Sequence, residues 1–372
     1  MAEMIKLGDV ATYINGYAFK PEDRGKEGLP IIRIQDLTGN TYDLGFYNGE
    51  YPEKIEINDG DVLISWSASL GVYIWNRGKA LLNQHIFKVE FDKVEIDKNY
   101  FVYAVRRKLN EMASKTHGAT MKHIVKKDFD ATLIPYPSME TQAEISNNLD
   151  KVSRIISARE EELQKLDELI KARFVELFED GASPLKTIEE LCSEIVDCPH
   201  TTPKYEGDLK NPTIRTSEIK KGYITWDSMK YVSDEEYEER VSRLRPEAGD
   251  IVYGREGTFG NAAVLPEGYK FCLGQRVMLL RPDYTKCTSE YLLHAVISDD
   301  VYRQAVGKNN ASTVAHVNVK DVKQFKVPLP SFDKQNQFAE FVKEVNKSKV
   351  AVQKSLDETQ KLFDSLMQEY FG

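Results

Sequence analysis

Two short polar loops carry side chains suited to reading the edges of nucleic-acid bases. Residues 65–69 read Ser-Trp-Ser-Ala-Ser, and residues 254–258 read Gly-Arg-Glu-Gly-Thr. The guanidinium of Arg255 can donate two hydrogen bonds to guanine, and the carboxylate of Glu256 can accept one from cytosine. The first loop offers Trp66 and hydroxyl groups instead, so the two loops would read different bases. An interpretation of Trp66 as a core residue fits the sequence equally well.

Two further segments, residues 118–123 and 307–316, mix small, amide and hydroxyl side chains with basic ones. Such a mixture can contact phosphates and base edges together. Basic or polar residues at recurring positions complete the set of candidates. The candidate DNA contacts are Arg33, Ser65, Trp66, Ser67, Ser69, Gln84, Lys115, Thr120, Lys122, His123, Lys126, His200, Thr201, Arg215, Arg255, Glu256, Thr258, Gln275, Arg276, Lys308, Asn309, Ser312 and His316.

The net charge of the whole chain argues against nucleic-acid binding, whereas the charge of two short stretches favours it. A net charge of −9 is unusual for a nucleic-acid binder. Residues 101–127, however, contain seven Lys or Arg against one Glu, and the matching residues 301–327 contain five against one Asp. A solvated surface would explain either cluster alone. Their recurrence at the same place favours two phosphate-binding patches.

The second half of the chain repeats the first at an offset of about 190 residues. Gly-Asp-Val-Leu at residues 60–63 recurs as Gly-Asp-Ile-Val at 249–252, and a polar loop follows each. The further pairs in this ordered series are Arg33 and Arg215, Gln84 and Gln275, His85 and Arg276, His123 and His316, Pro135 and Pro328, Pro137 and Pro330, and Gln142 and Gln335. A smaller offset before residue 60 predicts that one copy gained residues in a surface loop.

Each copy is predicted to be a mixed α/β globule that ends in a long helix. Apolar runs at residues 61–66 and 250–255 follow turn signals, as strands do. The proline pairs fix an extended exit from each copy, because proline blocks helix formation. The expected domains are residues 1–140 and 181–333 for the two globules, with helices at residues 141–180 and 334–372.

Apolar residues three and four apart run along both predicted helices in one heptad frame. The helices therefore either pair as an antiparallel coiled coil or pack on their own globules, since the same spacing suits both. Pairing would bury Leu149, Val152, Leu163, Val345, Val352 and Leu356. The seam residues are Leu149, Val152, Ile156, Leu163, Leu166, Ile170, Val345, Val352, Leu356 and Phe363.

Motifs of the common enzyme classes are missing from the sequence. It has no phosphate-binding loop, no dinucleotide-binding glycine motif, no amino-methyltransferase motif and no nucleophile elbow. The four cysteines form no C-x-x-C pair, so neither a zinc site nor another metal site is expected. Asp208 with Glu218 and Lys220 matches the spacing of a metal-dependent nuclease, a pattern common by chance. A cryptic nuclease is therefore only a minor alternative.

Over its whole length the chain resembles the specificity subunits of type I restriction-modification systems. The resemblance rests on the repeated Gly-Asp strands with their loops (60–71 and 249–260), the paired Pro-x-Pro exits with Gln142 and Gln335, and the long helices. Residues 198–203, Cys-Pro-His-Thr-Thr-Pro, also look like the opening of some target-recognition domains of that family.

The resemblance implies an α+β protein with two target-recognition domains that direct a DNA methyltransferase and a restriction complex. It implies double-stranded DNA, two modification (methyltransferase) subunits and restriction (translocase and nuclease) subunits as partners. S-adenosylmethionine, ATP and magnesium would bind only to those partners, and the chain would have no cofactor and no catalytic residue. We expect a cytoplasmic protein without a membrane segment, because residues 1–10 lack the apolar core of a signal peptide. A protein-protein adaptor with duplicated domains is the main alternative.

Overall fold

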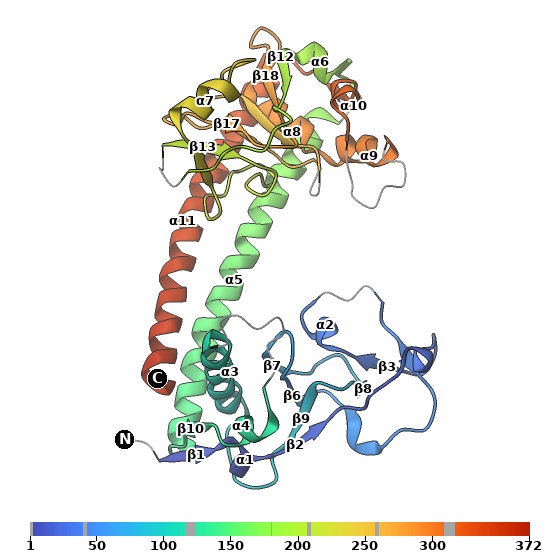
Figure 1. The fold of residues 1–372 in the computed structure, drawn as a ribbon, viewed down its shortest axis with the longest axis vertical. Coiled ribbons are helices and arrows are strands. Elements are labelled where there is room, and N and C mark those ends of the chain that lie inside the picture. Colours follow the sequence, from blue (N-terminus) through green and yellow to red (C-terminus); the bar gives the residue numbers. More distant parts are fainter. Residues whose placement is uncertain are drawn as a thin grey trace. The chain divides into compact units, whose positions relative to one another are not determined.

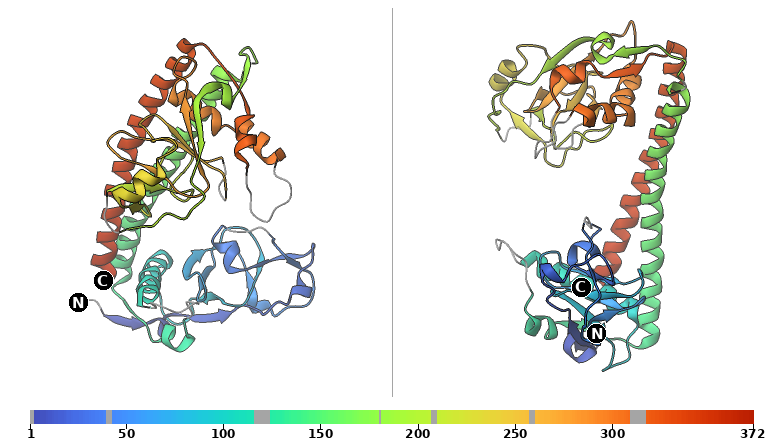
Figure 2. Two further views of the ribbon diagram at one scale, coloured as in Figure 1. Left: turned by 45° about the horizontal axis from the view of Figure 1, so that its top comes forward. Right: turned by 90° about the vertical axis from the view of Figure 1, so that its right-hand side faces the viewer.

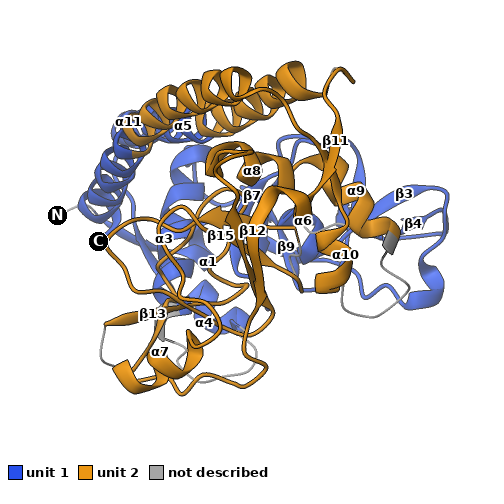
Figure 3. Ribbon diagram, turned by 90° about the horizontal axis from the view of Figure 1, so that it is seen from above, with its two compact units in different colours: residues 1–160, 354–372 blue, residues 161–353 orange. Residues whose placement is uncertain are grey.

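The computed structural model describes residues 3–39, 43–115, 124–179, 181–206, 210–256, 260–308 and 317–372. It divides into two units, which Figure 3 shows in different colours. The first unit contains residues 1–160 and 354–372, and the second contains residues 161–353. Both long helices cross this division, so each unit includes part of each helix.

The first unit contains two four-stranded sheets and a two-stranded ribbon (Figure 1). One sheet has the order β2 (Thr12–Asn15), β9 (Ile86–Glu90), β6 (Val62–Ser65), β7 (Gly71–Ile74). The other has the order β4 (Phe46–Tyr47), β3 (Leu29–Ile32), β8 (Ala80–Leu82), β5 (Glu56–Ile57), and β1 (Met4–Lys6) pairs with β10 (Leu133–Pro135). The helices of this unit are α1 (Leu7–Val10), α2 (Ile34–Leu37), α3 (Lys98–Lys115) and α4 (Lys126–Asp130), with single 3-10 turns η1 (Pro21–Asp23) and η2 (Glu53–Ile55).

The second unit repeats this topology. Its larger sheet has the order β12 (Cys192–Asp197), β18 (Val277–Pro282), β15 (Ile251–Gly254), β16 (Ala262–Val264). Its smaller sheet has the order β14 (Lys230–Val232), β13 (Asn211–Ile214), β17 (Cys272–Leu273), and β11 (Leu185–Thr187) pairs with β19 (Lys326–Pro328). The helices are α6 (Ile188–Leu191), α7 (Asp234–Arg240), α8 (Ser289–Val296), α9 (Asp299–Lys308) and α10 (Val319–Lys323).

The predicted internal repeat is thus confirmed, with every strand of the first unit except β5 matched by a described strand of the second. In the larger sheet of each unit, the strand that comes first in the chain pairs antiparallel with the one that comes last, β2 with β9 and β12 with β18. The smaller sheet of each unit contains one parallel pair, β3 with β8 or β13 with β17. The predicted strands at residues 61–66 and 250–255 are β6 and β15, whose residues are all buried. Helix α7 lies in the connection where the second copy has additional residues.

The repeated Gly-Asp pair makes the turn that begins each of these strands. Gly60 and Gly249 have φ angles of 91° and 92°, a region that glycine enters without steric cost. The following carboxylates then accept hydrogen bonds from the backbone N–H three residues earlier, Asp61 from Asn58 and Asp250 from Glu247, both at 2.8 Å. Glycine and aspartate therefore recur because the same turn is built twice.

The repeated glutamines connect each globule to its long helix. Gln142 accepts a hydrogen bond from the backbone N–H of Asp97 and donates one to the carbonyl of Pro137. Gln335 likewise accepts from Thr288 and donates to Pro330. Both glutamines are fully buried, so each provides partners for backbone groups that water cannot reach.

The long helices are α5 (Met139–Phe178) and α11 (Phe332–Phe371), each beginning two residues before the predicted start at residue 141 or 334. In the second unit Lys334 donates to the carbonyl of Leu177, and Lys349 forms an ion pair with Asp167. Contacts that ascend along one helix while descending along the other identify an antiparallel pair. In the first unit the start of α5 shares a core with the end of α11, and Figure 2 shows the helices side by side.

The seam between the helices is less regular than predicted. Leu149, Val152, Ile170, Val345 and Val352 are buried. The predicted burial of Leu163 and Leu356 is corrected, because both are only partly buried, as are Ile156, Leu166 and Phe363. The ends of the helices also pack on the globules, so both interpretations of the apolar spacing hold in part.

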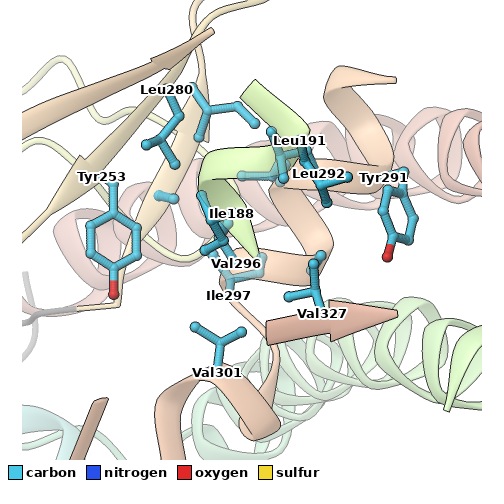
Figure 4. Packing of buried hydrophobic residues seen from close by; sticks show 14 of the residues in the cluster. Ile188, Leu191, Tyr253, Leu280, Tyr291, Leu292, Val296, Ile297, Val301 and Val327 are labelled. Carbon is cyan, nitrogen blue, oxygen red and sulfur yellow. The ribbon is translucent and has the colours of Figure 1, made fainter. Parts of the chain in front are cut away.

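The core of the second unit lies between its larger sheet, helices α6 and α8, and the long helices. Figure 4 shows Leu191, Leu292 and Val296 converging in this cluster, which Phe174 and Phe338 of the long helices join. In the described parts of the chain, every helix is too short or too polar to cross a membrane.

Candidate nucleic-acid interface

A pocket of about 410 Å³ opens in the second unit where strands β12 and β15 end. The turn before β18 and the start of α10 complete its walls. The lining residues are Asp197, Cys198, His200, Arg255, Gln275, Arg276, Asn318 and Val319. Four predicted DNA contacts, which come from three separate stretches of sequence, are therefore brought together here.

Arg255 lies at the bottom of this pocket, with a side chain only 7% exposed. Its guanidinium donates to the Asp197 carboxylate at 2.7 Å and to the carbonyl of Val317 at 3.4 Å. Its backbone N–H donates to the carbonyl of Arg276. These contacts argue against the expectation that Arg255 reads guanine, because its side chain is buried and its two terminal nitrogens donate to Val317 and Asp197. Its Nε is also buried and has no hydrogen-bond partner among the described residues. Arg255 instead joins four chain segments that form the pocket.

The exposed rim of the pocket is formed by Arg276, Gln275 and His200. Arg276 forms an ion pair with Glu256, and its side chain remains 55% exposed. Gln275 donates to the hydroxyl of Thr202 at 3.1 Å, and an imidazole nitrogen of His200 lies 3.6 Å from Asp197. Because the Glu256 carboxylate is engaged by Arg276, the two side chains act as a pair.

Thr201 has a structural contact that its sequence position did not predict. Its carbonyl and hydroxyl oxygens both lie 3.4 Å from the guanidinium of the buried Arg240, which can donate to them. Arg240 also donates to the carbonyl of Leu273. Thr201 therefore helps to fix the segment that carries His200.

Trp66 occupies in the first unit the position that Arg255 has in the second. Its backbone N–H donates to the carbonyl of His85, and its carbonyl accepts from Ile124, as Arg255 does with Arg276 and Val317. The indole stacks on Phe87 with ring centroids 5.5 Å apart, and the His85 ring meets it edge-on at 4.9 Å. An aromatic cluster thus replaces the Arg255–Asp197 ion pair, which supports the core interpretation of Trp66.

The serines of the first loop differ in accessibility. Ser65 is fully buried, and its hydroxyl donates to the carbonyl of Ser69 at 2.5 Å. Ser67 is also buried, whereas Ser69 and Gln84 are exposed. The assignment of Ser65 as a DNA contact is corrected accordingly, because the residue is fully buried and its hydroxyl is bonded within the loop. Ser67, 8% exposed, stays a prediction.

Arg33 and Arg215 close the same turn in the two units. Each uses its backbone N–H and its Nε to bind the carboxylate three residues later, Asp36 or Glu218, at 2.9 to 3.1 Å. Both carboxylates are buried. Both arginines therefore stabilise a turn, and because their side chains are 17% and 23% exposed, their assignment as DNA contacts stays a prediction.

The two basic stretches are less positive than their composition indicates. Arg107 and Lys108 both pair with Glu111, and Lys126 pairs with Asp130 at 2.7 Å. In the second unit Lys323 pairs with Glu189, and Arg303 pairs with Asp300. Three acidic residues outside the counted stretches, Asp130, Glu189 and Asp300, thus offset part of the local charge, and the Lys126 side chain remains 53% exposed.

Some predicted contacts lie outside the described residues or have undescribed side chains. They are Lys115, Thr120, Lys122, His123, Thr258, Lys308, Asn309, Ser312 and His316.

The groups considered for metal chemistry have structural roles. Burial would raise the pKa of Glu218, but hydrogen bonds from Arg215, Ser217 and Ser228 lower it below its usual value. This carboxylate is thus occupied, and Asp208 lies outside the described residues. Burial raises the pKa of the Cys287 thiol to about 12, which keeps it protonated. Among the described residues, no three His, Cys, Asp or Glu side chains are grouped to hold a metal ion.

Asp197, Cys198 and Asn318 were not among the predicted contacts, yet they line the pocket. His85, which packs against Trp66 in the first unit, was not predicted either. The repeat contained a signal for two of them. Asn15 and Asp197 end equivalent strands. The unit that contains Arg255 thus has an acidic residue at this strand end, and the unit that contains Trp66 has an uncharged one. His85 is the counterpart of Arg276, which was predicted.

Comparisons with known proteins agree with this architecture. The sequence profile of the type I restriction modification DNA specificity domain matches residues 2–168 and 203–359. The type I restriction enzyme EcoBI specificity subunit of Escherichia coli is 24% identical, over 92% of this chain and 78% of that protein. The MjaVIII specificity subunit of Methanocaldococcus jannaschii is 22% identical, over 92% and 86%.

Solved structures show the same fold. The crystal structure of a type I restriction-modification S subunit from M. genitalium superposes with a TM-score of 0.54 at 15% identity, covering 100% of this chain and 96% of that one. A chain from a study of complex assembly and conformational transition of the type I R-M system gives a TM-score of 0.56, covering 99% and 97% at 15% identity.

Proposed function

Because this chain belongs to the family of type I restriction modification DNA specificity domains, we propose that it recognises a two-part DNA sequence, with one part read by each unit. One observation carries the proposal. The two units share a framework down to single backbone hydrogen bonds, yet differ in the side chains at the strand ends, Trp66 with His85 in one and Arg255 with Arg276 in the other. A common scaffold with different side chains is the arrangement expected for two readers of different sequences.

The target would therefore be asymmetric and interrupted. Each unit contacts its own half-site, and the bases between the half-sites are not read. In other two-headed readers the half-site centres lie about 34 Å apart, one turn of the DNA helix. We adopt that spacing for this chain as a working value.

The chain would act as the specificity subunit of a larger complex. Relatives are named as specificity subunits of type I restriction enzymes, so we assign this chain methyltransferase and restriction subunits as partners, with two methyltransferase subunits per chain. S-adenosylmethionine, ATP and magnesium then bind to those partners, and this chain catalyses no step itself. We place its action in the cytoplasm, together with the DNA and the partner subunits.

Fluorescence anisotropy tests the DNA-binding part of the proposal. The chain, alone and with its methyltransferase subunits, is titrated with a labelled duplex containing the target and with a scrambled duplex. We expect both to bind, with the target bound about 10³-fold or more tightly in the complex at physiological salt. Binding that is absent for all duplexes, with the chain folded, would instead favour a protein-protein adaptor.

A further inference from the structure

One turn in each unit has backbone strain at a residue that is not glycine. His85 and Arg276 have φ angles of 72° and 62°, in the left-handed region. They occupy equivalent positions, directly before β9 and β18. Among the described residues, Ala68 is the one other non-glycine residue with positive φ. Such conformations cost energy for residues with a Cβ and persist where the surrounding structure imposes them.

The backbone at these positions does not require a large side chain. The carbonyl of His85 accepts from Trp66, and that of Arg276 accepts from Arg255. Glycine would supply the same carbonyl without strain. Both units nevertheless have a large side chain that can form hydrogen bonds at this position. This indicates that the side chain has a role beyond that of the backbone carbonyl.

The surroundings of Arg276 favour contact with a base. Its side chain lies on the pocket rim beside the exposed Gln275, is 55% exposed, and is paired with Glu256. The Glu256 carboxylate holds one end of the guanidinium, at Nη1. An oriented, accessible guanidinium is the group that binds O6 and N7 of guanine with two hydrogen bonds.

His85 has a different environment, with its ring against Trp66. An imidazole donates to a single acceptor, so it distinguishes bases less sharply than a guanidinium does. The first unit would then have the weaker discrimination at this position.

We propose that Arg276 reads a guanine in the half-site of the second unit, positioned by Glu256, and that His85 is its base-reading counterpart in the first unit. This inference rests on the proposed function. The guanine contact first predicted for the buried Arg255 is thus assigned to Arg276 instead.

Glycine variants separate base reading from a structural role. Arg276→Gly and His85→Gly keep the backbone conformation, relieve its strain and remove the side chain. Arg245→Ala is a matched control, because Arg245 lies in the same unit, is 52% exposed and pairs with Glu238. Each variant is expressed with the cognate methyltransferase subunits, and the methylated sequences of the host DNA are determined. Thermal unfolding of the purified proteins checks the fold.

We expect Arg276→Gly to relax one base pair of one half-site, with discrimination falling about 5- to 150-fold there. His85→Gly should relax one position of the other half-site by less, and Arg245→Ala should retain the full target. A folded Arg276→Gly variant that methylates an unchanged target would overturn the inference while leaving the proposed function intact. If the unaltered chain directs methylation to no defined target, both the inference and the proposed function fail.

Discussion

Replacing Arg255 with methionine tests the structural role that burial assigns to it. Methionine retains most of the length of the side chain and removes the charge. The Asp197 carboxylate, 19% exposed, then loses the guanidinium donor at 2.7 Å and retains the backbone N–H of Cys198 at 3.0 Å. The pocket segments that Arg255 joins would lose their common contact.

Removing one partner of a buried ion pair destabilises a protein by about 3 to 5 kcal/mol. Because Asp197 is partly exposed and retains one donor, we take the lower value, about 3 kcal/mol. In a unit of this size, each kcal/mol lowers the unfolding temperature by about 2 to 4 °C. Arg255→Met should therefore lower the unfolding temperature of the second unit by about 6 to 12 °C, and all positions of its half-site should be read less well.

Differential scanning calorimetry measures this shift, with the unaltered chain as the reference. Arg245→Met is the control, because it breaks an exposed pair worth at most about 1 kcal/mol. The double variant Asp197→Asn, Arg255→Met should recover most of the loss, since no charge is left unpaired. An Arg255→Met shift no larger than that of the control would refute the reasoning.

Three further variants test other parts of the structure. Leu149→Ala, at a fully buried position, should lower the free energy of unfolding by about 2 to 5 kcal/mol, whereas the partly buried Leu163→Ala should cost much less; equal losses in urea denaturation would contradict the assigned seam. Lys126→Ala should flatten the dependence of DNA affinity on salt by about 0.9 in the log-log slope without altering sequence preference, and an unchanged slope in anisotropy titrations would place the phosphate contacts elsewhere. The pKa of Glu218 is lowered in the folded protein, so its stabilising effect is present above the unfolded carboxyl pKa of about 4.3 and is lost as pH falls through the folded value. Glu218→Gln should accordingly be less stable than the natural chain at pH 7 and approach it in acid, and a difference that stays constant with pH would argue against this.

The repeated framework could be predicted because its signals are local. Gly60 with Asp61 and Gly249 with Asp250 specify a turn and a strand within a few residues, and the proline exits precede the helices directly. The apolar spacing predicted the two long helices and left open whether they pair with each other or pack on the globules. The burial of individual residues along the helices could not be predicted, because the ends of α5 and α11 also pack on the globules. Lys349, at the position that Ile156 has in the first copy, forms an ion pair with Asp167.

The roles of individual site residues depended on contacts between distant parts of the sequence. Arg255 appears exposed in its own loop, but Asp197, from another strand, neutralises it. Lys323 adds to a local basic count, yet it pairs with Glu189. Composition could not reveal either pairing, because both depend on how the strands and helices come together.

The sequence specificity of methylation directed by the natural chain tests the central claim most directly. The chain is expressed with its methyltransferase subunits in a host without other methyltransferases, and every methylated site is sequenced. We predict one asymmetric target of two specified parts separated by a fixed number of unspecified bases. A palindromic, uninterrupted target would contradict the account of two units that each read a different half-site.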